Sequence, residues 1–332
     1  MNNIISDEIV VQVTDMKVYF DIDKRKFART GRKVVRAVDG VSFDLRKGEI
    51  LSLVGESGSG KTTTGKAILQ LVPVTSGEVK FNGAPVSKEK AMLKAFRQKA
   101  QMIYQDPYQS LNPRLNILDI IAEPLDVNHL AGTEKERMGK VCSALETAGL
   151  TPPEDFLYRY PYELSGGQRQ RVVVAGAMIM DPDFIVADEP VSMLDASIRT
   201  SILRLMLEMR DKTGVSYLFI THDLSLAWLI SDRIAIMYLG KIMEIGPAEE
   251  IIKNGIHPYT RALTKIMPVP GVNKDKERIV LEGETPDASI EMTGCRFCGR
   301  CPVAMAECSE KEPEFKMAGP EHLVACHRFS EA

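Results

Sequence analysis

The chain has 332 residues, of which 44% are hydrophobic and 26% are charged, which is enough for one large packed domain with additions. Its 42 Lys and Arg against 45 Asp and Glu give a net charge of −3, without the basic excess typical of nucleic-acid-binding proteins. The longest apolar stretch, Val172–Met180, is too short to cross a bilayer, which takes ~20 apolar residues. Because Met1–Val10 also lacks the pattern of a signal peptide, we expect a cytoplasmic protein whose membrane contact goes through partners.

The predicted elements alternate between strand and helix. Three short apolar runs predict buried strands: Glu49–Val54, Phe184–Ala187 and Tyr217–Ile220. Helices are expected at Lys61–Leu71, before Pro73, and at Ala196–Lys212, where Gly214 can end the helix. This alternation predicts an α/β fold with a parallel sheet covered by helices.

Two further regions differ from this pattern. Residues 107–180 favour helix and predict a helical subdomain inserted in the sheet domain. Prolines are expected at its joints: Pro113, Pro124, Pro152, Pro153 and Pro161. After Gly246 prolines become frequent and clear periodicity is lost. We therefore place a domain boundary near residue 255, between a large domain at 1–255 and a small, irregular, Cys-rich module at 256–332.

The strongest motif lies between the first predicted strand and the first predicted helix. It fits G-x-x-x-x-G-K-[ST] and comprises Gly55, Glu56, Ser57, Gly58, Ser59, Gly60, Lys61 and Thr62, with Thr63 adjoining. Glycines let the backbone wrap around phosphate oxygens, and the helix start adds partial positive charge. We expect this phosphate loop to bind ATP, with Lys61 at the β- and γ-phosphates and Thr62 as a Mg²⁺ ligand.

Two carboxylates follow the second predicted strand, where open α/β sheets bind ligands. Asp188 is the candidate Mg²⁺ ligand, and Glu189 is placed to polarise the attacking water. Adjacent acids at a strand end are common, so this prediction depends on the phosphate loop upstream.

Further motifs, taken with the phosphate loop, make the chain resemble the ATP-binding cassette (ABC) family over nearly its whole length. They are Leu164–Gln168 (L-S-G-G-Q), Gln105 within Ile103–Asp106, the turn Ser192–Asp195, and His222 directly after a strand. The resemblance implies a P-loop NTPase fold, with a RecA-like core, an antiparallel β subdomain and the inserted helical subdomain.

The resemblance also implies how ATP is bound. Two subunits face head to tail, and each ATP lies between the phosphate loop of one subunit and the signature residues of the other: Ser165, Gly166, Gly167 and Gln168. This signature is itself a glycine-rich helix start that can bind phosphate. Asp195 is then expected to cross the dimer interface.

Further roles follow from the same resemblance. Gln105 contacts Mg²⁺ and the attacking water and couples the site to the helical subdomain, and His222 contacts the γ-phosphate. An aromatic residue near the N-terminus stacks on adenine; Tyr19 fits best and Phe20 is the alternative. Tyr19 is equally open to interpretation as an ordinary strand aromatic.

The C-terminal part is similar to the oligopeptide/dipeptide importer class. The segments that carry this similarity are His257–Leu263, Met267–Pro270, Gly294–Pro302, and Cys308 with Val324–His327. The intact signature, with Glu189–Ser192, resembles the F-type subunit of the D/F pair. The resemblance implies an ATPase that powers import of oligopeptides, dipeptides or related oligosaccharides from the cytoplasmic face of the membrane. Its implied partners are a D-type ATP-binding subunit or a second copy, two membrane permease subunits and an extracytoplasmic solute-binding protein.

The alternative is an ABC-superfamily ATPase in DNA maintenance or translation. DNA-maintenance members insert a long coiled coil between phosphate loop and signature, and no sustained heptads lie between Lys61 and Ser165. Translation members carry two cassettes per chain, and this chain has one.

The cysteines are unevenly spread. Cys142 stands alone, and the others lie near the C-terminus: Cys295, Cys298, Cys301, Cys308 and Cys326. In a reducing compartment such a group favours a metal site over disulfides. Three interpretations remain open: a [4Fe–4S] cluster, structural Zn²⁺, and free or oxidised thiols. The resemblance favours the cluster, with Cys295, Cys301, Cys308 and Cys326 as ligands and Cys298 as an extra thiol.

Overall fold

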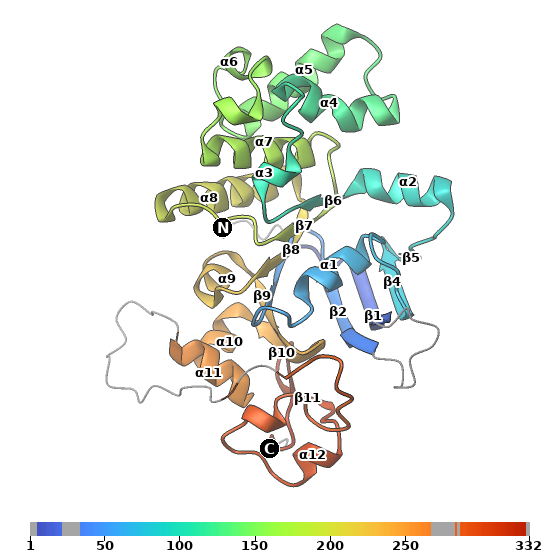
Figure 1. The fold of residues 1–332 in the computed structure, drawn as a ribbon, viewed down its shortest axis with the longest axis vertical. Coiled ribbons are helices and arrows are strands. Elements are labelled where there is room, and N and C mark those ends of the chain that lie inside the picture. Colours follow the sequence, from blue (N-terminus) through green and yellow to red (C-terminus); the bar gives the residue numbers. More distant parts are fainter. Residues whose placement is uncertain (1–4, 22–33, 267–282, 284–285, 330–332) are drawn as a thin grey trace, which may run out of the picture. The chain divides into compact units, whose positions relative to one another are not determined.

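The computed structural model in Figure 1 describes residues 5–21, 34–266, 283 and 286–329. The chain divides into two compact units, each described by itself below. Unit 1 comprises Met1–Val10, Arg46–Glu49 and Val86–Leu218. Unit 2 comprises Val11–Leu45, Ile50–Pro85 and Phe219–Ala332.

Unit 1 contains a parallel strand pair with helices beside it. Strands β6 (Ala100–Ile103) and β7 (Phe184–Asp188) pair from Ala100↔Phe184 to Ile103↔Ala187, and β7 is buried along its whole length. Helix α2 (Lys90–Lys99) precedes β6, and α8 (Ala196–Thr213) follows β7. The predicted end of α8 is confirmed, because Gly214 takes the left-handed conformation there with φ 73°. Strand β8 (Ser216–Thr221) begins in this unit and continues into unit 2.

The predicted helical subdomain is helical in unit 1. It contains α3 (Pro107–Ser110), α4 (Ile117–Asn128), α5 (Glu134–Thr147), α6 (Glu154–Leu157) and α7 (Gly166–Met178). Helices α4, α5 and α7 pack on one another and appear in green in Figure 1. One expectation was wrong: Pro124 lies inside α4 instead of at a joint, since the helix continues through it to Asn128.

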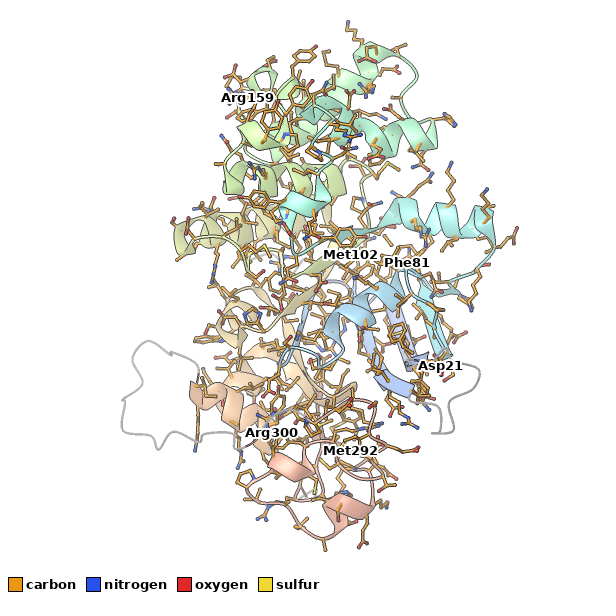
Figure 2. The ribbon with its side chains drawn as sticks, viewed as in Figure 1. Asp21, Phe81, Met102, Arg159, Met292 and Arg300 are labelled. Carbon is orange, nitrogen blue, oxygen red and sulfur yellow. The ribbon has the colours of Figure 1, made fainter. Side chains whose placement is uncertain are left out.

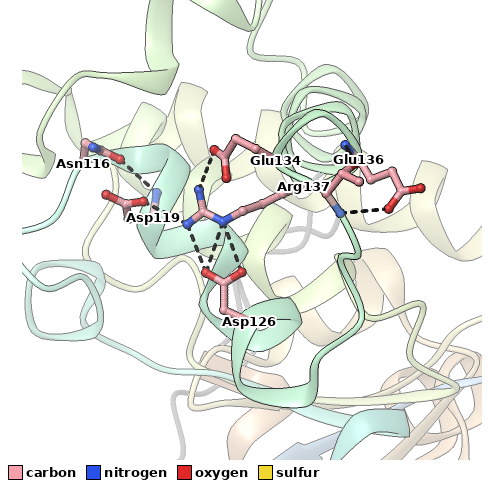
Figure 3. Close-up of polar contacts among 7 residues, drawn as sticks. Asn116, Asp119, Asp126, Glu134, Glu136 and Arg137 are labelled. Carbon is pink, nitrogen blue, oxygen red and sulfur yellow. Dashed lines mark hydrogen bonds and ion pairs between the residues drawn. The ribbon is translucent and has the colours of Figure 1, made fainter.

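A charged cluster ties α4 to α5, as Figure 3 shows. Arg137 of α5 donates to both carboxylate oxygens of Asp126 (Nε at 3.1 Å from each) and to Asp119 at 2.8 Å. Glu134, one turn earlier in α5, lies 3.3 Å from the same guanidinium. Because the Arg137 side chain is only 14% exposed, these charge-assisted bonds lie in a partly desolvated setting and fix the packing of the two helices.

The first sheet of unit 2 confirms the expected antiparallel β subdomain. Its strand order is β2–β1–β4–β5, with antiparallel pairing of β1 with β4 and of β4 with β5. The strand bounds are β1 Ile9–Asp21, β2 Val34–Arg46, β4 Ser76–Phe81 and β5 Ala84–Pro85.

The second sheet of unit 2 carries the phosphate loop. Its strands run in the order β11–β12–β10–β9–β3, with β3 and β9 parallel. The bounds are β3 Ile50–Val54, β9 Arg233–Tyr238, β10 Lys241–Pro247, β11 Phe315–Gly319 and β12 His322–Ala325. The helices of this unit are α1 Lys61–Ile68, α9 Leu224–Ile230, α10 Ala248–Asn254, α11 Pro258–Ile266 and α12 Glu307–Glu310, with the 3₁₀ turn η2 at Cys298–Arg300.

The C-terminal part is less irregular than expected. The hairpin β11–β12 extends the second sheet of unit 2 by antiparallel pairing of β12 with β10. The predicted segment Met267–Pro270 lies outside the described residues. The boundary near residue 255 stays a prediction.

A buried carboxylate joins these segments. Glu244 of β10 has no exposed surface and accepts hydrogen bonds from the backbone N–H groups of Ile256 (2.8 Å) and His257 (3.0 Å). The Nε2 atom of His322 in β12 lies 2.7 Å from the same carboxylate. Three segments that are distant in sequence therefore meet at one side chain.

Across the part of the chain that the structure describes, no helix combines the length and apolar character needed to span a membrane.

Candidate nucleotide-binding site

The phosphate loop follows the fully buried strand β3 and leads into α1, as the motif predicts. Gly60 precedes the helix with φ 101°, and a Cβ atom there would lie 2.1 Å from the carbonyl oxygen of Ala37. Only glycine fits a position that is both left-handed and closed on one side by backbone. The tight turn that a phosphate needs is therefore built into the chain.

Lys61 is buried and turned into this loop. Its Nζ atom donates to the carbonyl oxygens of Gly55 and Glu56, both at 2.8 Å, and lies 3.4 Å from Ser59 Oγ. The ammonium group is thus held inside the curve of the backbone, where a polyphosphate would meet positive charge and helix-start amides together. Thr62 and Thr63 follow in the first turn of α1 and are half-buried.

The acidic residues lie in unit 1 at the end of β7. Asp188 is 4% exposed, and Glu189 takes a left-handed conformation with φ 47° immediately after the strand. Ser192 fixes that turn, since its N–H and hydroxyl groups donate to the Glu189 carbonyl at 3.2 and 3.1 Å. Gln105 Nε2 donates to the Glu189 carboxylate at 3.1 Å. Two of the three candidate catalytic side chains are therefore in contact.

The third candidate, His222, belongs to unit 2 and follows β8 directly. It is exposed, and the next residue, Asp223, caps α9 by accepting from the N–H groups of Ser225 (2.8 Å) and Leu226 (3.4 Å). This cap ends the strand sharply and holds the histidine at the C-terminal end of β8.

The signature residues form the start of α7 in unit 1. Ser165 and Gln168 make a reciprocal capping box: Gln168 N–H donates to Ser165 Oγ at 3.3 Å, and Ser165 N–H donates to Gln168 Oε1 at 3.0 Å. Gly167 packs against Ile198 of α8, where a Cβ atom would come within 2.9 Å of Cγ2. Asp195, at the start of α8, is exposed.

On the side expected to receive adenine, Tyr19 is half-buried in β1 and its hydroxyl donates to Asp39 Oδ1. Burial and this hydrogen bond raise the pKa of Tyr19 to about 12. The guanidinium carbon of Arg36 lies 5.8 Å from the centre of the Tyr19 ring. Phe20, the alternative, is 38% exposed.

Sequence reasoning missed the residues that hold Tyr19 and Glu56 in place. Asp39 is ion-paired with Arg296, and Glu56 Oε2 lies 2.8 Å from Arg300 Nη1. Burial opposes ionisation of Asp39, but the hydrogen bond from Tyr19 and the charges of Lys241 and Arg296 lower its pKa overall. The available signal was the alternation of arginine with cysteine in the segment Cys295–Cys301.

The five C-terminal cysteines converge in unit 2. Cys295, Cys298, Cys301, Cys308 and Cys326 all line one small cavity, beside Phe297 and His327. Burial raises the pKa of the Cys295 thiol to about 12, and the nearby Cys308, Cys326 and Cys301 act in the same direction. Among the residues for which side chains are described, no group of three or more His, Cys, Asp or Glu has the arrangement of a metal site.

Comparisons with known proteins bear on this geometry. Residues 38–192 match the family model for ABC transporter proteins, and residues 243–308 match that for the C-terminal region of oligopeptide/dipeptide transporters. The oligopeptide transport ATP-binding protein AppF of Bacillus subtilis (strain 168) is 46% identical over 98% of this chain and 99% of its own length. The oligopeptide transport ATP-binding protein OppF of the same organism is 52% identical over 75% of this chain and 82% of its own.

Solved structures agree on the fold. The dimeric ATP-binding cassette MJ0796 bound to ADP and Pi is 27% identical with a TM-score of 0.63, over 72% of this chain and 98% of that one. The cbiO1 protein of Clostridium perfringens, 22% identical with a TM-score of 0.64, matches 75% of this chain and 92% of its own and shares the fold. The predicted P-loop NTPase fold is confirmed.

Proposed function

This chain belongs to the ABC transporter ATP-binding proteins of the oligopeptide/dipeptide class, and we propose that its ATP hydrolysis powers the import of oligopeptides or dipeptides. Its activity is that of a transporter ATPase, which converts ATP and water to ADP and phosphate. Related oligosaccharides are the alternative cargo. Peptide cargo is supported by the match of residues 243–308 and by the names of the two Bacillus subtilis relatives described above.

The observation that carries the proposal is the contact between Gln105 and Glu189 at the end of β7. A carboxylate that polarises water must be held in a fixed position, and here its backbone is fixed by Ser192 and its side chain by Gln105. Gln105 lies between β6 and the helical subdomain along the chain, so its contact with Glu189 links the carboxylate to the segment that leads into those helices.

We assign the phosphate-binding role to Lys61 and the backbone of the phosphate loop. Lys61 moves from its contacts with the Gly55 and Glu56 carbonyls to the β- and γ-phosphates, and His222 contacts the γ-phosphate. The hydroxyl of Thr62 and the carboxylate of Asp188 are oxygen donors of the kind that Mg²⁺ prefers, so both fit that ion. Mg²⁺, when bound, neutralises charge on the transferring phosphate.

The dimer role belongs to the start of α7. We propose that Ser165, Gly166, Gly167 and Gln168 contact the γ-phosphate of an ATP held by a second subunit, and that Asp195 lies at that interface. ATP then favours the closed dimer because it makes these contacts only there, and hydrolysis removes them. The second subunit is a D-type ATP-binding subunit or another copy of this chain. Two membrane permeases and an extracytoplasmic solute-binding protein complete the complex, and this chain lies at the cytoplasmic face of the membrane.

The cysteine cavity fits an iron–sulfur cluster in its chemistry. Thiols converge on one cavity, and thiolates are the ligands of such clusters. We propose that Cys295, Cys301, Cys308 and Cys326 hold a [4Fe–4S] cluster, with Zn²⁺ as the alternative. Iron and acid-labile sulfide analysis after anaerobic purification tests this, with Cys142→Ser as the control for Cys308→Ser. Stoichiometric zinc without sulfide would contradict the cluster.

The experiment that tests the proposed function is the substitution Glu189→Gln. Removing the carboxylate while keeping the shape should lower ATP hydrolysis by at least about 100-fold. ATP binding should persist and ATP should trap the dimer, as measured by nucleotide binding and light scattering. Glu208→Gln, an exposed change on α8 in the same unit, is the matched control. Hydrolysis by the Glu189 variant at the normal rate would refute the catalytic assignment.

A further inference from the structure

Two arginines alternate with the cysteines of the C-terminal module, and both form ion pairs with residues outside that module. In the segment Cys295–Cys301, Arg296 pairs with Asp39, and Arg300, labelled in Figure 2, pairs with Glu56. The two arginine side chains are only 7% and 9% exposed. The acceptor side chains Asp39 and Glu56 are 12% and 27% exposed, so both ion pairs are partly desolvated and removing one partner is costly. The cysteine segment is therefore firmly attached to two other parts of unit 2.

Both attachment points belong to the nucleotide site. Asp39 is the acceptor for the hydroxyl of Tyr19, the residue expected to stack on adenine. Arg296 therefore acts on the orientation of the Tyr19 ring through one carboxylate. Lys241, whose Nζ lies 3.7 Å from the same carboxylate, adds a second positive charge.

The second attachment point lies in the phosphate loop itself. Glu56 is held at three groups: its carboxylate by Arg300 at 2.8 Å, its N–H by Tyr259 Oη at 3.0 Å, and its carbonyl by Lys61 Nζ at 2.8 Å. A bare carboxylate here would repel a triphosphate, and Arg300 offsets that charge. The loop conformation and its charge thus both depend on the C-terminal module.

A packed aromatic cluster makes the connection rigid. The ring of Tyr259 lies 4.8 Å from that of Tyr238 and 5.2 Å from that of Phe297, between centroids. Phe297 lies next to Arg296 in sequence, and these rings share one core cluster with Cys295 and Cys308. A displacement of the cysteine segment is therefore transmitted to the residues that Arg296 and Arg300 hold.

We propose that Arg296 and Arg300 are positioning residues for ATP, with Arg296 setting the adenine-binding side and Arg300 setting the phosphate-binding side. Through them, the cysteine module determines nucleotide affinity. This inference rests on the proposed function, since it requires ATP to bind at the phosphate loop.

The two arginines have different binding signatures, which a purely structural role would not produce. Arg300→Gln removes the positive charge that offsets Glu56, so it should weaken the binding of ATP and of inorganic tripolyphosphate by about tenfold each, and the binding of ADP by less. The loss should shrink as salt is raised, because screening weakens the repulsion. Arg296→Gln should weaken the binding of ATP and of ADP to a similar degree and leave tripolyphosphate binding unchanged.

Binding is measured by calorimetry on the full chain with ATP, ADP and tripolyphosphate at two salt concentrations. The double variant Glu56→Gln/Arg300→Gln removes both charges and should restore tripolyphosphate affinity to within about threefold of wild type. Arg300→Lys and Arg296→Lys keep the charge and should retain most of the affinity, even where the glutamine variants fold poorly. Arg328→Gln is the control, since Arg328 donates to the Val303 carbonyl inside the same module.

The outcomes separate the two levels of inference. If wild-type protein fails to bind ATP, the proposed function falls and this inference falls with it. If wild type binds ATP, and if Arg296→Gln and Arg300→Gln bind all three ligands as tightly as wild type, this inference alone is overturned. An equal loss of affinity for all three ligands in both glutamine variants, without rescue in the double variant Glu56→Gln/Arg300→Gln, would also overturn it. That pattern indicates general loosening of the fold.

Discussion

Two helices in this chain begin at glycine-rich turns, and the two starts are completed in different ways. Helix α1 follows Gly60, which has no side chain with which to cap the helix, and Lys61 lies folded into the loop beside it. Helix α7 follows Ser165, which shares a reciprocal capping box with Gln168. In the first start the lysine ammonium lies among the loop carbonyls, whereas in the second the N–H groups of Ser165 and Gln168 already have side-chain acceptors.

In the proposed function, the two helix starts meet different requirements of a nucleotide site shared by two subunits. A loop that binds phosphate in its own subunit needs a mobile positive charge and backbone amides that a ligand can take over. A surface that must meet a nucleotide held elsewhere needs a stable shape before that encounter, and the capping box supplies it. We therefore expect changes at α1 to abolish binding and changes at α7 to act on stability and on dimer-dependent hydrolysis.

The largest effect is expected at Lys61. Lys61→Ala removes the only side-chain ammonium of the phosphate loop motif and should lower ATP hydrolysis by about 100-fold or more, with a clear loss of ATP affinity. Phosphate release and nucleotide binding measure the two effects. Lys66→Ala, in the last turn of the same helix, is the control and should retain activity. Full activity of the Lys61 variant would contradict the assignment of phosphate binding to the start of α1.

A smaller effect is expected at Gly167, where α7 meets α8. Gly167→Ala places a methyl group 2.9 Å from Ile198 Cγ2 and should cost about 1–3 kcal/mol of unfolding free energy through overpacking. Denaturant unfolding measures this cost. Gly176→Ala in the same helix is a close control, because its added methyl group would meet no heavy atom within 4 Å beyond its chain neighbours and the helix backbone, and it should be neutral or stabilising. Equal behaviour of the two variants would show that the α7–α8 contact is loose.

The smallest effect is expected at Ser165. Ser165→Ala removes the cap of α7 and should cost about 1 kcal/mol of stability. ATP affinity of the isolated subunit should stay unchanged, while hydrolysis in the assembled dimer should fall. Ser197→Ala, an exposed change in α8, is the control. A drop in ATP affinity of the isolated Ser165 variant would contradict the assignment of this helix start to the second nucleotide.

The sequence predicted those parts of the molecule that depend on local pattern. Strand β3, the phosphate loop and α1 follow one another without a gap, and Gly214 ends α8 because a left-handed position favours glycine. The end of α1 was less accurate: the helix stops at Ile68 instead of Leu71. Gln70 takes φ 53° there, so the helix ends earlier than Pro73 alone would require.

Long-range contacts could not be predicted in this way. The pairing of Arg296 with Asp39 and of Arg300 with Glu56 joins residues far apart in the chain, and periodicity carries no information about such partners. The hairpin β11–β12 is short and is stabilised by pairing with β10, so its local sequence pattern does not predict it. Pro124 is tolerated inside α4 because packing on α5 and α7 outweighs its unfavourable propensity.

Glu244 gives the last residues of the chain an unexpected importance. A protein shortened after β11 would lose His322, and a carboxylate sealed inside the sheet would be left with two backbone amides as partners. Trimming the tail would therefore leave β10 with a desolvated charge and destabilise the layer that also contains β9 and β3. The hairpin β11–β12 is therefore needed for a stable sheet, and the activity of a protein that lacks it would reflect a destabilised nucleotide-binding domain.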